Sequence, residues 1–204
     1  TDQKADPPPQ NETAVEPVSS SAKANDLNGI NVVLDPGHGG RDPGAIGLNG
    51  VYEKKLTLSM AKRIASELES AGATAILTRS SDRYLSLPER LHISSAYHTD
   101  VFLSVHFNAH PFSAVNGIST YYYSPENRQL AYNMQESLAD HTSLHNRGVM
   151  HDGFYVLRNN ADKALLLELG FLTNSHDLQT IQTSDYANNV SKAIRSALVN
   201  HLNE

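Results

Sequence analysis

Short, continuously apolar runs alternate with amphipathic segments along most of this chain. Three of these runs are VVL (32–34), VFLSV (101–105) and ALLLELG (164–170), which consist mainly of aliphatic residues. A strand with one wet face alternates apolar and polar residues, whereas a continuous apolar run is typical of a strand buried on both faces. The sequence therefore predicts an α/β fold with a mostly parallel, twisted sheet and helices on both faces.

The segments between these runs have the periodicity of helices. Residues 53–72 place Leu56, Met60, Ile64 and Leu68 at four-residue steps, which gives the segment one apolar face. Further helices are predicted at residues 86–97, 125–142 and 185–202, and further strands at residues 73–79, 117–123 and 153–158.

The first 27 residues differ in composition from the rest of the chain. They hold four of the nine prolines, no aromatic residue and few large aliphatic ones. Such a segment cannot bury enough apolar surface to offset the entropy lost on ordering. We therefore predict a disordered linker over residues 1–27 and one folded domain over residues 28–204.

Composition excludes several kinds of site and partner. The chain has no cysteine, so any metal must be bound by His, Asp or Glu, and disulfides are impossible. Its formal net charge is −6, without the basic excess that a broad nucleic-acid surface requires, so we expect no nucleic-acid partner. The absence of cysteine is also compatible with an exported protein.

Polar side chains that can carry chemistry stand at or near the ends of three predicted strands. His38 follows the first apolar run in a glycine-rich loop, His106 ends VFLSVH, and Glu168 interrupts LLLELG. If these strands are parallel, the three side chains reach one edge of the sheet, and Glu53 at the start of the next helix can return to that edge. Two imidazoles and one carboxylate form a common zinc-binding set with a position left for water, and a second carboxylate can accept the proton of that water.

Each of these residues also has a purely structural interpretation. His38 fits a surface residue in a turn, Glu53 fits a residue that complements the helix N-terminus, and His106 fits a hydrogen-bonded core residue. Glu168 is the hardest to explain in this way, because a carboxylate within an apolar strand costs several kcal/mol unless it is paired or bound to a metal. A common edge favours one site over four separate structural roles.

The spacing of His106 and His110 is misleading. His106 and His110 are four residues apart, as in a zincin helix, but Phe107 stands where that motif requires glutamate. The segment also leaves a strand and runs into Pro111, so the two imidazoles are not expected to share a helical face. We predict that His110 lies at the rim of the site, and His151 is a candidate to border the cleft.

Seven separate motifs occur in a fixed order along residues 30–202. They are VVLDPGHGGRDPGAIG, EKKLTLSMAKRIASEL, LTRSSDRYLSLPER, DVFLSVHFNAH, GISTYYY, NRGV…FYVLR and ALLLELGFLTN. In this order they resemble the motifs of zinc-dependent N-acetylmuramoyl-L-alanine amidases of the amidase-3 type. The resemblance implies a fold like that of zinc exopeptidases. It also implies that His38, Glu53 and His106 bind Zn²⁺ and that Glu168 is the catalytic residue.

The resemblance implies an activity as well. Enzymes of this type cleave the amide bond between N-acetylmuramic acid and the L-alanine that begins the peptide stem of peptidoglycan. Here Zn²⁺ would polarise the carbonyl, while Glu168 would take the proton of water and pass it to the leaving nitrogen. Asn108 and Arg79 lie in stretches similar to family motifs and are expected to orient substrate or loops, although structural hydrogen bonding explains them equally well.

The expected partner is therefore peptidoglycan, and the expected location of this cell-wall hydrolase (an autolysin) is extracellular, in the cell wall or in the periplasm. The linker suggests an upstream signal, anchor or wall-binding module, and an activator protein is compatible with this type of enzyme. The segments after His106 leave no room for the inserted helix that blocks the zinc in some amidases, so we expect an open site. The alternatives are a non-catalytic peptidoglycan-binding module and a zinc peptidase that acts on the stem peptide.

Overall fold

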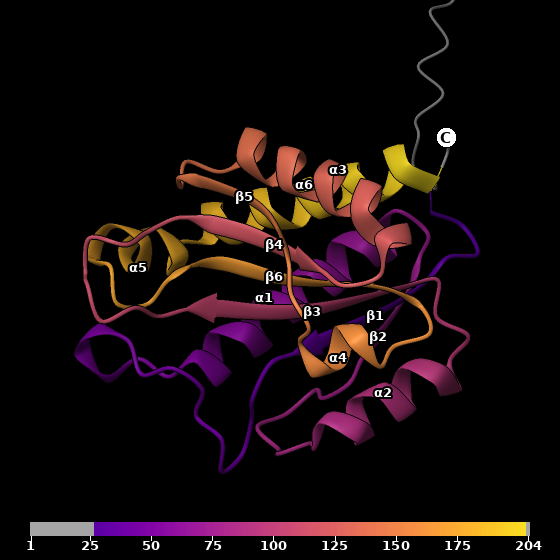
Figure 1. Cartoon of the computed structure of the whole chain (residues 1–204), viewed down its shortest axis with the longest axis horizontal. Helices are drawn as coiled ribbons and strands as arrows, with labels where there is room; N and C mark the ends of the chain where they lie inside the picture. Colours follow the sequence, from indigo (N-terminus) through magenta and orange to yellow (C-terminus); the bar gives the residue numbers. More distant parts are fainter. Residues whose placement is uncertain (1–26, 203–204) are drawn as a thin grey trace, which may run out of the picture.

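The computed structural model describes residues 27–202, which form one six-stranded sheet with helices on both faces (Figure 1). The strands are β1 (Asn31–Pro36), β2 (Thr74–Leu77), β3 (Val101–Asn108), β4 (Ile118–Tyr122), β5 (Asn146–His151) and β6 (Lys163–Phe171). Their order across the sheet is β2-β1-β3-β6-β4-β5. The first four strands in this order are parallel, β4 is antiparallel to β6, and β5 is parallel to β4. The predicted α/β fold with a mostly parallel sheet is confirmed.

Two layers of helices enclose this sheet. The helices are α1 (Glu53–Ser70), α2 (Leu87–Ala96), α3 (Arg128–His141), α4 (Tyr155–Arg158), α5 (Ser175–Ile181) and α6 (Ser184–Leu202), with short 3-10 turns η1 (Leu48–Gly50) and η2 (Pro125–Asn127). One face carries α1, α3 and α6, and α6 packs against both of the others (Figure 1). The smaller layer, α2 and α4, lies on the opposite face.

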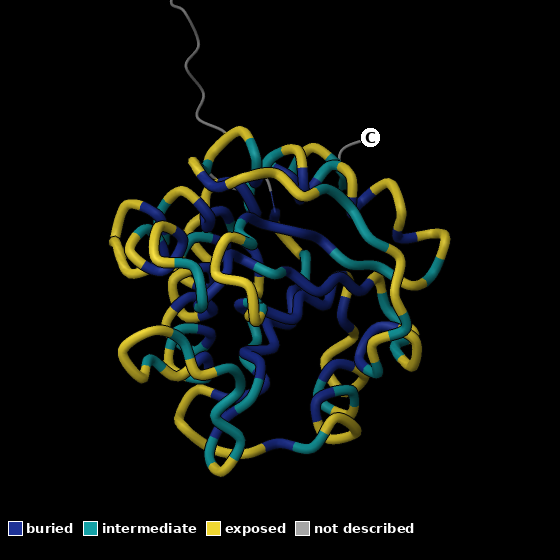
Figure 2. The backbone as a smooth tube through the Cα atoms, turned by 60° about the vertical axis from the view of Figure 1, so that its left-hand side comes forward, coloured by how far each residue is buried: buried dark blue, intermediate teal, exposed yellow. Residues whose placement is uncertain are grey.

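The apolar runs of β1, β3 and β6 form the centre of the core, which is the dark blue interior of Figure 2. Val32 and Leu34 belong to a large cluster that includes residues of α1, α3 and α6. Val33 points the other way, into a smaller cluster with Phe102 and Leu166. Both faces of these strands are therefore dry, which explains their continuous apolar character.

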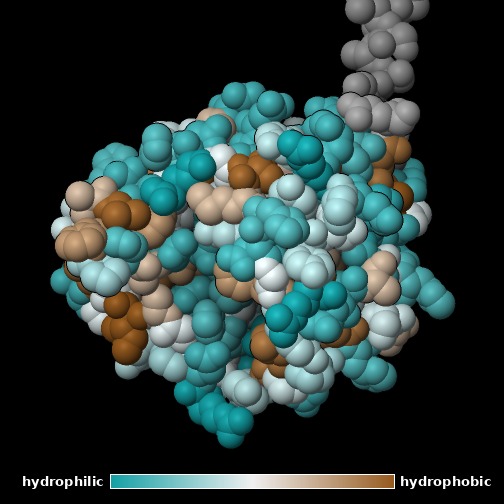
Figure 3. Space-filling model, in the orientation of Figure 1, coloured by the Kyte–Doolittle hydropathy of each residue, from teal (hydrophilic) through white to brown (hydrophobic). Residues whose placement is uncertain are grey.

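The surface differs from this interior. On the face shown in Figure 3 it is mainly hydrophilic, and its hydrophobic residues form separate small groups. Phe112 and Ile46 are the most exposed of the large apolar side chains within the described range. Among residues 27–202, no helix has both the length and the apolar character needed to cross a membrane.

Local sequence signals fix the start of α2. The Ser86 side chain accepts a hydrogen bond from the backbone N–H of Glu89, and the Glu89 carboxylate accepts one from the backbone N–H of Ser86. Pro88 occupies the first turn, where its missing N–H costs nothing. Because α2 begins here, Arg90 is carried on the first turn of the helix and buried against the end of β1.

The predicted strand over residues 153–158 is wrong. This segment forms the short helix α4, and strand β5 lies earlier in the chain. In a strand, Val156 and Leu157 would point to opposite sides, whereas a helical turn lets both pack on the same face of the sheet. Both join the smaller cluster with Phe102 and Leu166, and this burial outweighs the strand propensity of the aromatic and β-branched residues.

The folded part also begins one residue earlier than predicted. Leu27 is fully buried, and its backbone N–H donates to the oxygen of Ala71, just past the end of α1. Its apolar side chain fills a place in the large cluster, so it belongs to the domain. The rest of the predicted linker, residues 1–26, lies outside the described residues and stays a prediction.

Candidate metal centre

The glycine-rich loop after β1 carries His38 over the carboxyl end of the sheet. Its backbone passes very close to β3, because a Cβ atom at Gly37 would lie 2.2 Å from Cε1 of His106. His38 has a φ of 63°, a conformation that costs energy in any residue other than glycine. This close and strained path brings the two imidazoles together, with ring centroids 4.9 Å apart.

A buried ion pair supports the strained part of this loop. Arg90 lies 2.6 Å from Asp35, and it also donates to the backbone oxygens of Pro36 and His38 at 2.9 and 2.8 Å. Asp35 is 1% exposed, and its buried charge is stabilised by Arg90 and by hydrogen bonds from Thr78 and Ser104. The ion pair therefore ties the backbone of His38 to the end of β1.

Arg79 supports the same loop from a second direction. Its guanidinium donates to the backbone oxygens of Pro36, Gly37 and Lys54, and to Oγ1 of Thr57. The residue is 0% exposed, so it cannot touch a substrate. Of the two roles expected for Arg79, its burial and its hydrogen bonds to Pro36 and Gly37 agree with holding the loop and not with contacting substrate.

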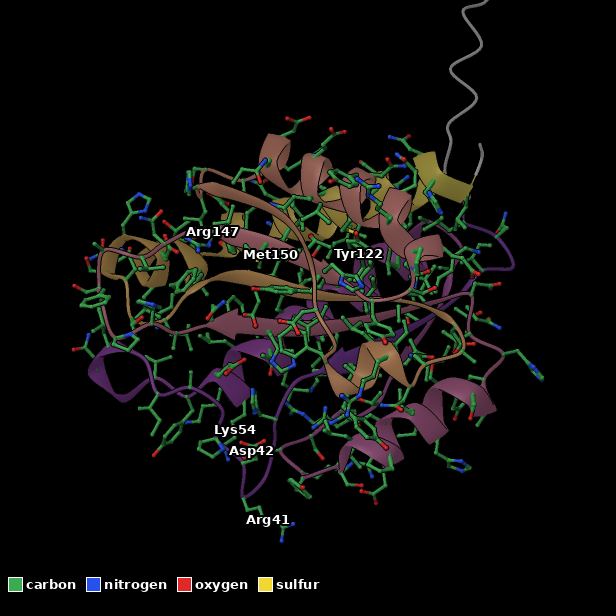
Figure 4. All side chains as sticks on the ribbon, in the orientation of Figure 1. Arg41, Asp42, Lys54, Tyr122, Arg147 and Met150 are labelled. Carbon is green, nitrogen blue, oxygen red and sulfur yellow. The ribbon has the colours of Figure 1, made fainter. Side chains whose placement is uncertain are left out.

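The outer part of the loop is held by charged side chains. Lys54 donates to the backbone oxygen of Gly40 at 2.7 Å and to Asp82 at 2.8 Å. Figure 4 shows Arg41 projecting from the tip of the loop. Hydrogen bonds thus hold the loop at Gly37 and His38, close to β1, and again at Gly40.

The carboxylate of Glu53 lies between the two imidazoles. Its Oε2 is 3.1 Å from Nε2 of His38, and its Oε1 is 2.9 Å from Nδ1 of His106. It also accepts hydrogen bonds from the backbone N–H groups of Ala45 and Phe107. Burial alone would raise the pKa of Glu53, but the hydrogen bonds with His106 and His38 outweigh this effect and hold the pKa well below its usual range. Glu53 is therefore kept as a carboxylate.

Asp42 contacts His38 on the other side of the ring. Oδ2 of Asp42 is 2.9 Å from Nδ1 of His38, and because an ionised carboxylate only accepts, Nδ1 is the donor. Metal-binding histidines commonly donate their second ring N–H to a carboxylate in this way. Sequence reasoning missed Asp42, although its position four residues after His38 in the same loop is a signal that could have identified it.

Glu168 approaches the same place from β6 but has different surroundings. It is the register partner of His106 on β3. Its Oε2 is buried and has no hydrogen-bond partner within residues 27–202. Burial, together with the charge of Glu53, raises the pKa of Glu168 well above its usual value. A buried carboxyl without a partner in a cavity is a candidate for a functional role rather than a structural one.

A cavity of about 540 Å³ joins these side chains. His38 and His106 keep 24% and 19% of their side chains exposed, so within the described chain the predicted open site is accessible to solvent. Glu168 lines the cavity, and so does Asn108, whose Oδ1 accepts the backbone N–H of Ala109. One wall is apolar and comes from α2, α4 and the residues before them: Leu85, Leu87, Phe154, Tyr155 and Val156.

Two histidines that the sequence placed near the site lie outside this cavity lining. His110 accepts the backbone N–H of Phe112 and stands beside its ring. His151 is exposed and stacks on Tyr123, with ring centroids 5.5 Å apart. Of the described histidines, only His38 and His106 line the cavity.

The donor set of the site fits a divalent metal ion. One ligand atom from each of His38, Glu53 and His106 lies within 4.8 Å of the other two. Two imidazole nitrogens and a carboxylate oxygen are ligands that Zn²⁺ prefers, and three protein ligands leave a coordination position open for chemistry. The supported loop and the contact from Asp42 hold these atoms in place before any ion binds.

An α/β domain with this ligand set and an adjacent unpaired carboxyl at the edge of its sheet has the layout of a metal-dependent hydrolase. The sequence profile of the N-acetylmuramoyl-L-alanine amidase family matches residues 32–200. The chain belongs to this family.

Named relatives and solved structures agree with this assignment. The N-acetylmuramoyl-L-alanine amidase LytC of Bacillus subtilis is 37% identical over 193 residues, which cover 91% of this chain and 39% of LytC. The chain thus spans about two fifths of the length of that relative. The catalytic domain of CwlV, an amidase from Bacillus (Paenibacillus) polymyxa var. colistinus, is 35% identical with a TM-score of 0.82, covering 85% of this chain and 98% of that domain. The CwlD amidase from Clostridioides difficile, solved in complex with the GerS lipoprotein, is 28% identical with a TM-score of 0.79, covering 85% of this chain and 98% of CwlD.

Proposed function

We propose that this chain hydrolyses the amide bond between N-acetylmuramic acid and L-alanine in peptidoglycan, and that it does so with Zn²⁺. The observation that carries the proposal is that one cavity holds two carboxyl groups whose pKa values are shifted in opposite directions. Glu53 is held in its charged form between two imidazoles, whereas Oε2 of Glu168 is buried without a hydrogen-bond partner among the described residues. Membership of the amidase family supports the choice of bond and substrate.

The residues of the site divide into ligands and a proton carrier. His38, Glu53 and His106 would hold the ion, with Asp42 orienting His38. When bound, Zn²⁺ supplies a Lewis acid that polarises the amide carbonyl and lowers the pKa of water to about 7. Glu168 would accept the proton of the attacking water and deliver it to the leaving nitrogen of L-alanine. Burial and the charge of Glu53 raise the pKa of Glu168 well above its usual value, which fits this role because a more basic carboxylate accepts a proton more readily.

The rest of the cavity suits a bulky substrate that is partly apolar. The glycines of the loop after β1 let its backbone pack closely against His38, Glu53 and His106, so they shape the site rather than make room for a glycan strand. Asn108 at the end of β3 would orient the polar part of the substrate, and the apolar wall would contact its methyl groups. No serine or cysteine nucleophile is required.

We place this activity at the cell wall, outside the cytoplasm, because a relative that is 35% identical, LytH of Staphylococcus epidermidis, is named a probable cell wall amidase. An activator protein is a second proposal, supported by the complex of CwlD with the GerS lipoprotein. Since the described site is open to solvent, restraint of the enzyme would come from such a partner or from its location rather than from a blocking segment.

Digestion of purified sacculi, with and without a metal chelator, tests the proposal. Mass spectrometry of the products should show intact peptide stems that begin with a free L-alanine amino group, and the chelator should abolish their release. Cleavage within the stem would instead indicate a zinc peptidase. Binding to sacculi with no new amino group, in the presence of added Zn²⁺, would indicate a non-catalytic module.

A further inference from the structure

A row of three polar side chains crosses the sheet beside the cavity. His106 on β3 is in register with Glu168 on β6, and Glu168 is in register with Ser119 on β4. Directly opposite residues of an antiparallel pair point to the same face, with Cβ atoms about 4.5–5.5 Å apart. Ser119 is therefore the direct neighbour of Glu168 on the side away from His106.

The neighbours of Ser119 on its own strand confirm which face it occupies. Ile118 belongs to the large cluster, and Thr120 donates to Gln135 of α3, so both point to the α3 face. Tyr121 packs against the smaller cluster on the opposite face. Since side chains alternate along a strand, Ser119 shares the face of Tyr121, which is also the face of Glu168.

Both members of this pair lack hydrogen-bond partners. Among residues 27–202, Oγ of Ser119 and Oε2 of Glu168 are buried without one. Other buried hydroxyls near the site are satisfied: Thr78 and Ser104 both donate to Asp35. A hydroxyl that can donate and a carboxylate that needs a donor thus stand side by side, each unsatisfied, and an unsatisfied buried polar atom is costly.

We infer that Ser119 is a positioning residue for Glu168. Its hydroxyl donates a hydrogen bond to the Glu168 carboxylate during catalysis, either after rotation of the two side chains or through one water molecule, and so keeps the carboxylate aimed at the cavity. Ser119 itself does not react, because it is 1% exposed and lies behind Glu168. The inference rests on the proposed function, in which Glu168 carries the proton.

The test uses variants of the zinc-loaded enzyme on a soluble muropeptide. Ser119→Ala should lower kcat about tenfold or more, the usual loss for one hydrogen bond to a charged group. KM should stay within about twofold and zinc content should not change, because the residue touches neither substrate nor metal. Ser119→Thr, which keeps the hydroxyl, should retain most of the activity, and Ser119→Cys, a weaker donor, should be intermediate. Ser191→Ala is the matched control, since it removes a buried hydroxyl that donates within α6.

A double-mutant cycle separates positioning from structural support. In a Glu168→Gln background, Ser119→Ala should cause no further loss of kcat, because its effect acts through Glu168. A wild-type kcat in Ser119→Ala, or an equal loss in the Ala and Thr variants, would overturn the inference. If wild-type enzyme releases no stems from peptidoglycan, the proposed function fails, whatever Ser119 does. If the wild type is active and Ser119→Ala is equally active, only this inference fails.

Discussion

Two regions of the molecule present the same type of side chain to one cavity in opposite ways. In the loop region after β1, Glu53 accepts two backbone N–H groups and contacts two imidazoles, and its pKa lies well below the usual range. At the end of β6, Glu168 has an unpartnered oxygen, and its pKa is raised by burial and by the charge of Glu53. Environments that shift the pKa values of two carboxyls in opposite directions suit them to different roles. One carboxyl remains an anion, and the other can exchange a proton.

The two regions also differ in how they are held. The loop around His38 is strained and depends on buried arginines that donate to its backbone oxygens. Strand β6 lies in the middle of the sheet, where ladder hydrogen bonds to β3 and β4 hold its backbone. The region proposed to bind an ion is therefore held by polar contacts, and the region proposed to transfer a proton is held by the sheet and its apolar surroundings.

The largest expected difference between the regions appears when each glutamate is changed to glutamine. Glu168→Gln should lower kcat about 10²–10⁴-fold, the range typical of a lost general acid–base group, while zinc stays bound. Glu53→Gln should lose activity together with the metal, because an amide is a poor replacement for a charged ligand. Measuring kcat and zinc content for the two purified variants tests both expectations. A Glu168→Gln variant that cleaves near the wild-type rate would exclude Glu168 as the proton carrier.

A smaller effect should distinguish the polar support of the loop from its surface. Arg90→Met removes the cation that pairs with the buried carboxylate of Asp35. This loss should reduce the free energy of unfolding by about 3–5 kcal/mol. Arg41→Met is the control, because Arg41 is exposed and stacks on Tyr84 at 4.2 Å. Its free energy of unfolding should hardly change. Urea denaturation of the metal-free proteins measures both, and equal losses would show that the buried ion pair does not support the loop.

The smallest effect concerns pH and the stability of the metal-free protein. Burial and the charge of Glu53 raise the pKa of Glu168 in the folded state, so its carboxyl is protonated in both states well below pH 4, while at higher pH the unfolded chain gives up the proton more readily. Wild-type protein should therefore lose stability relative to Glu168→Gln as the pH rises above the unfolded value of about 4.3. At pH 8 the variant should be the more stable by about 1–3 kcal/mol, the cost of an unsatisfied buried polar group. A difference that does not change with pH would contradict the account.

Much of the fold and the centre of the site could be predicted from the sequence because they depend on local patterns. Continuous apolar runs reveal strands that are dry on both faces, and a parallel sheet brings their ends together. His38, His106 and Glu168 were placed at one edge by this argument alone. The resemblance to the amidase family then separated the roles of Glu53 and Glu168, which spacing could not do.

The parts that could not be predicted depend on tertiary contacts. Residues 153–158 have strand propensity, yet the joint burial of Val156 and Leu157 on one face of the sheet selects a helical turn. Arg90 looks like an ordinary helix residue in the sequence, because its partner Asp35 is 55 positions away. The sequence allows Arg79 to orient either substrate or a loop. Only its complete burial in the folded chain shows that it does not reach substrate.

The central claim is that His38, Glu53 and His106 bind one metal ion while Glu168 stays outside the ligand set. Anomalous diffraction at the zinc absorption edge, from crystals grown with Zn²⁺, tests this claim most directly. We expect one strong peak bonded to those three side chains, with Glu168 facing the ion without a bond to it. A peak coordinated by Glu168, or one that lacks any of the three predicted ligands, would contradict it.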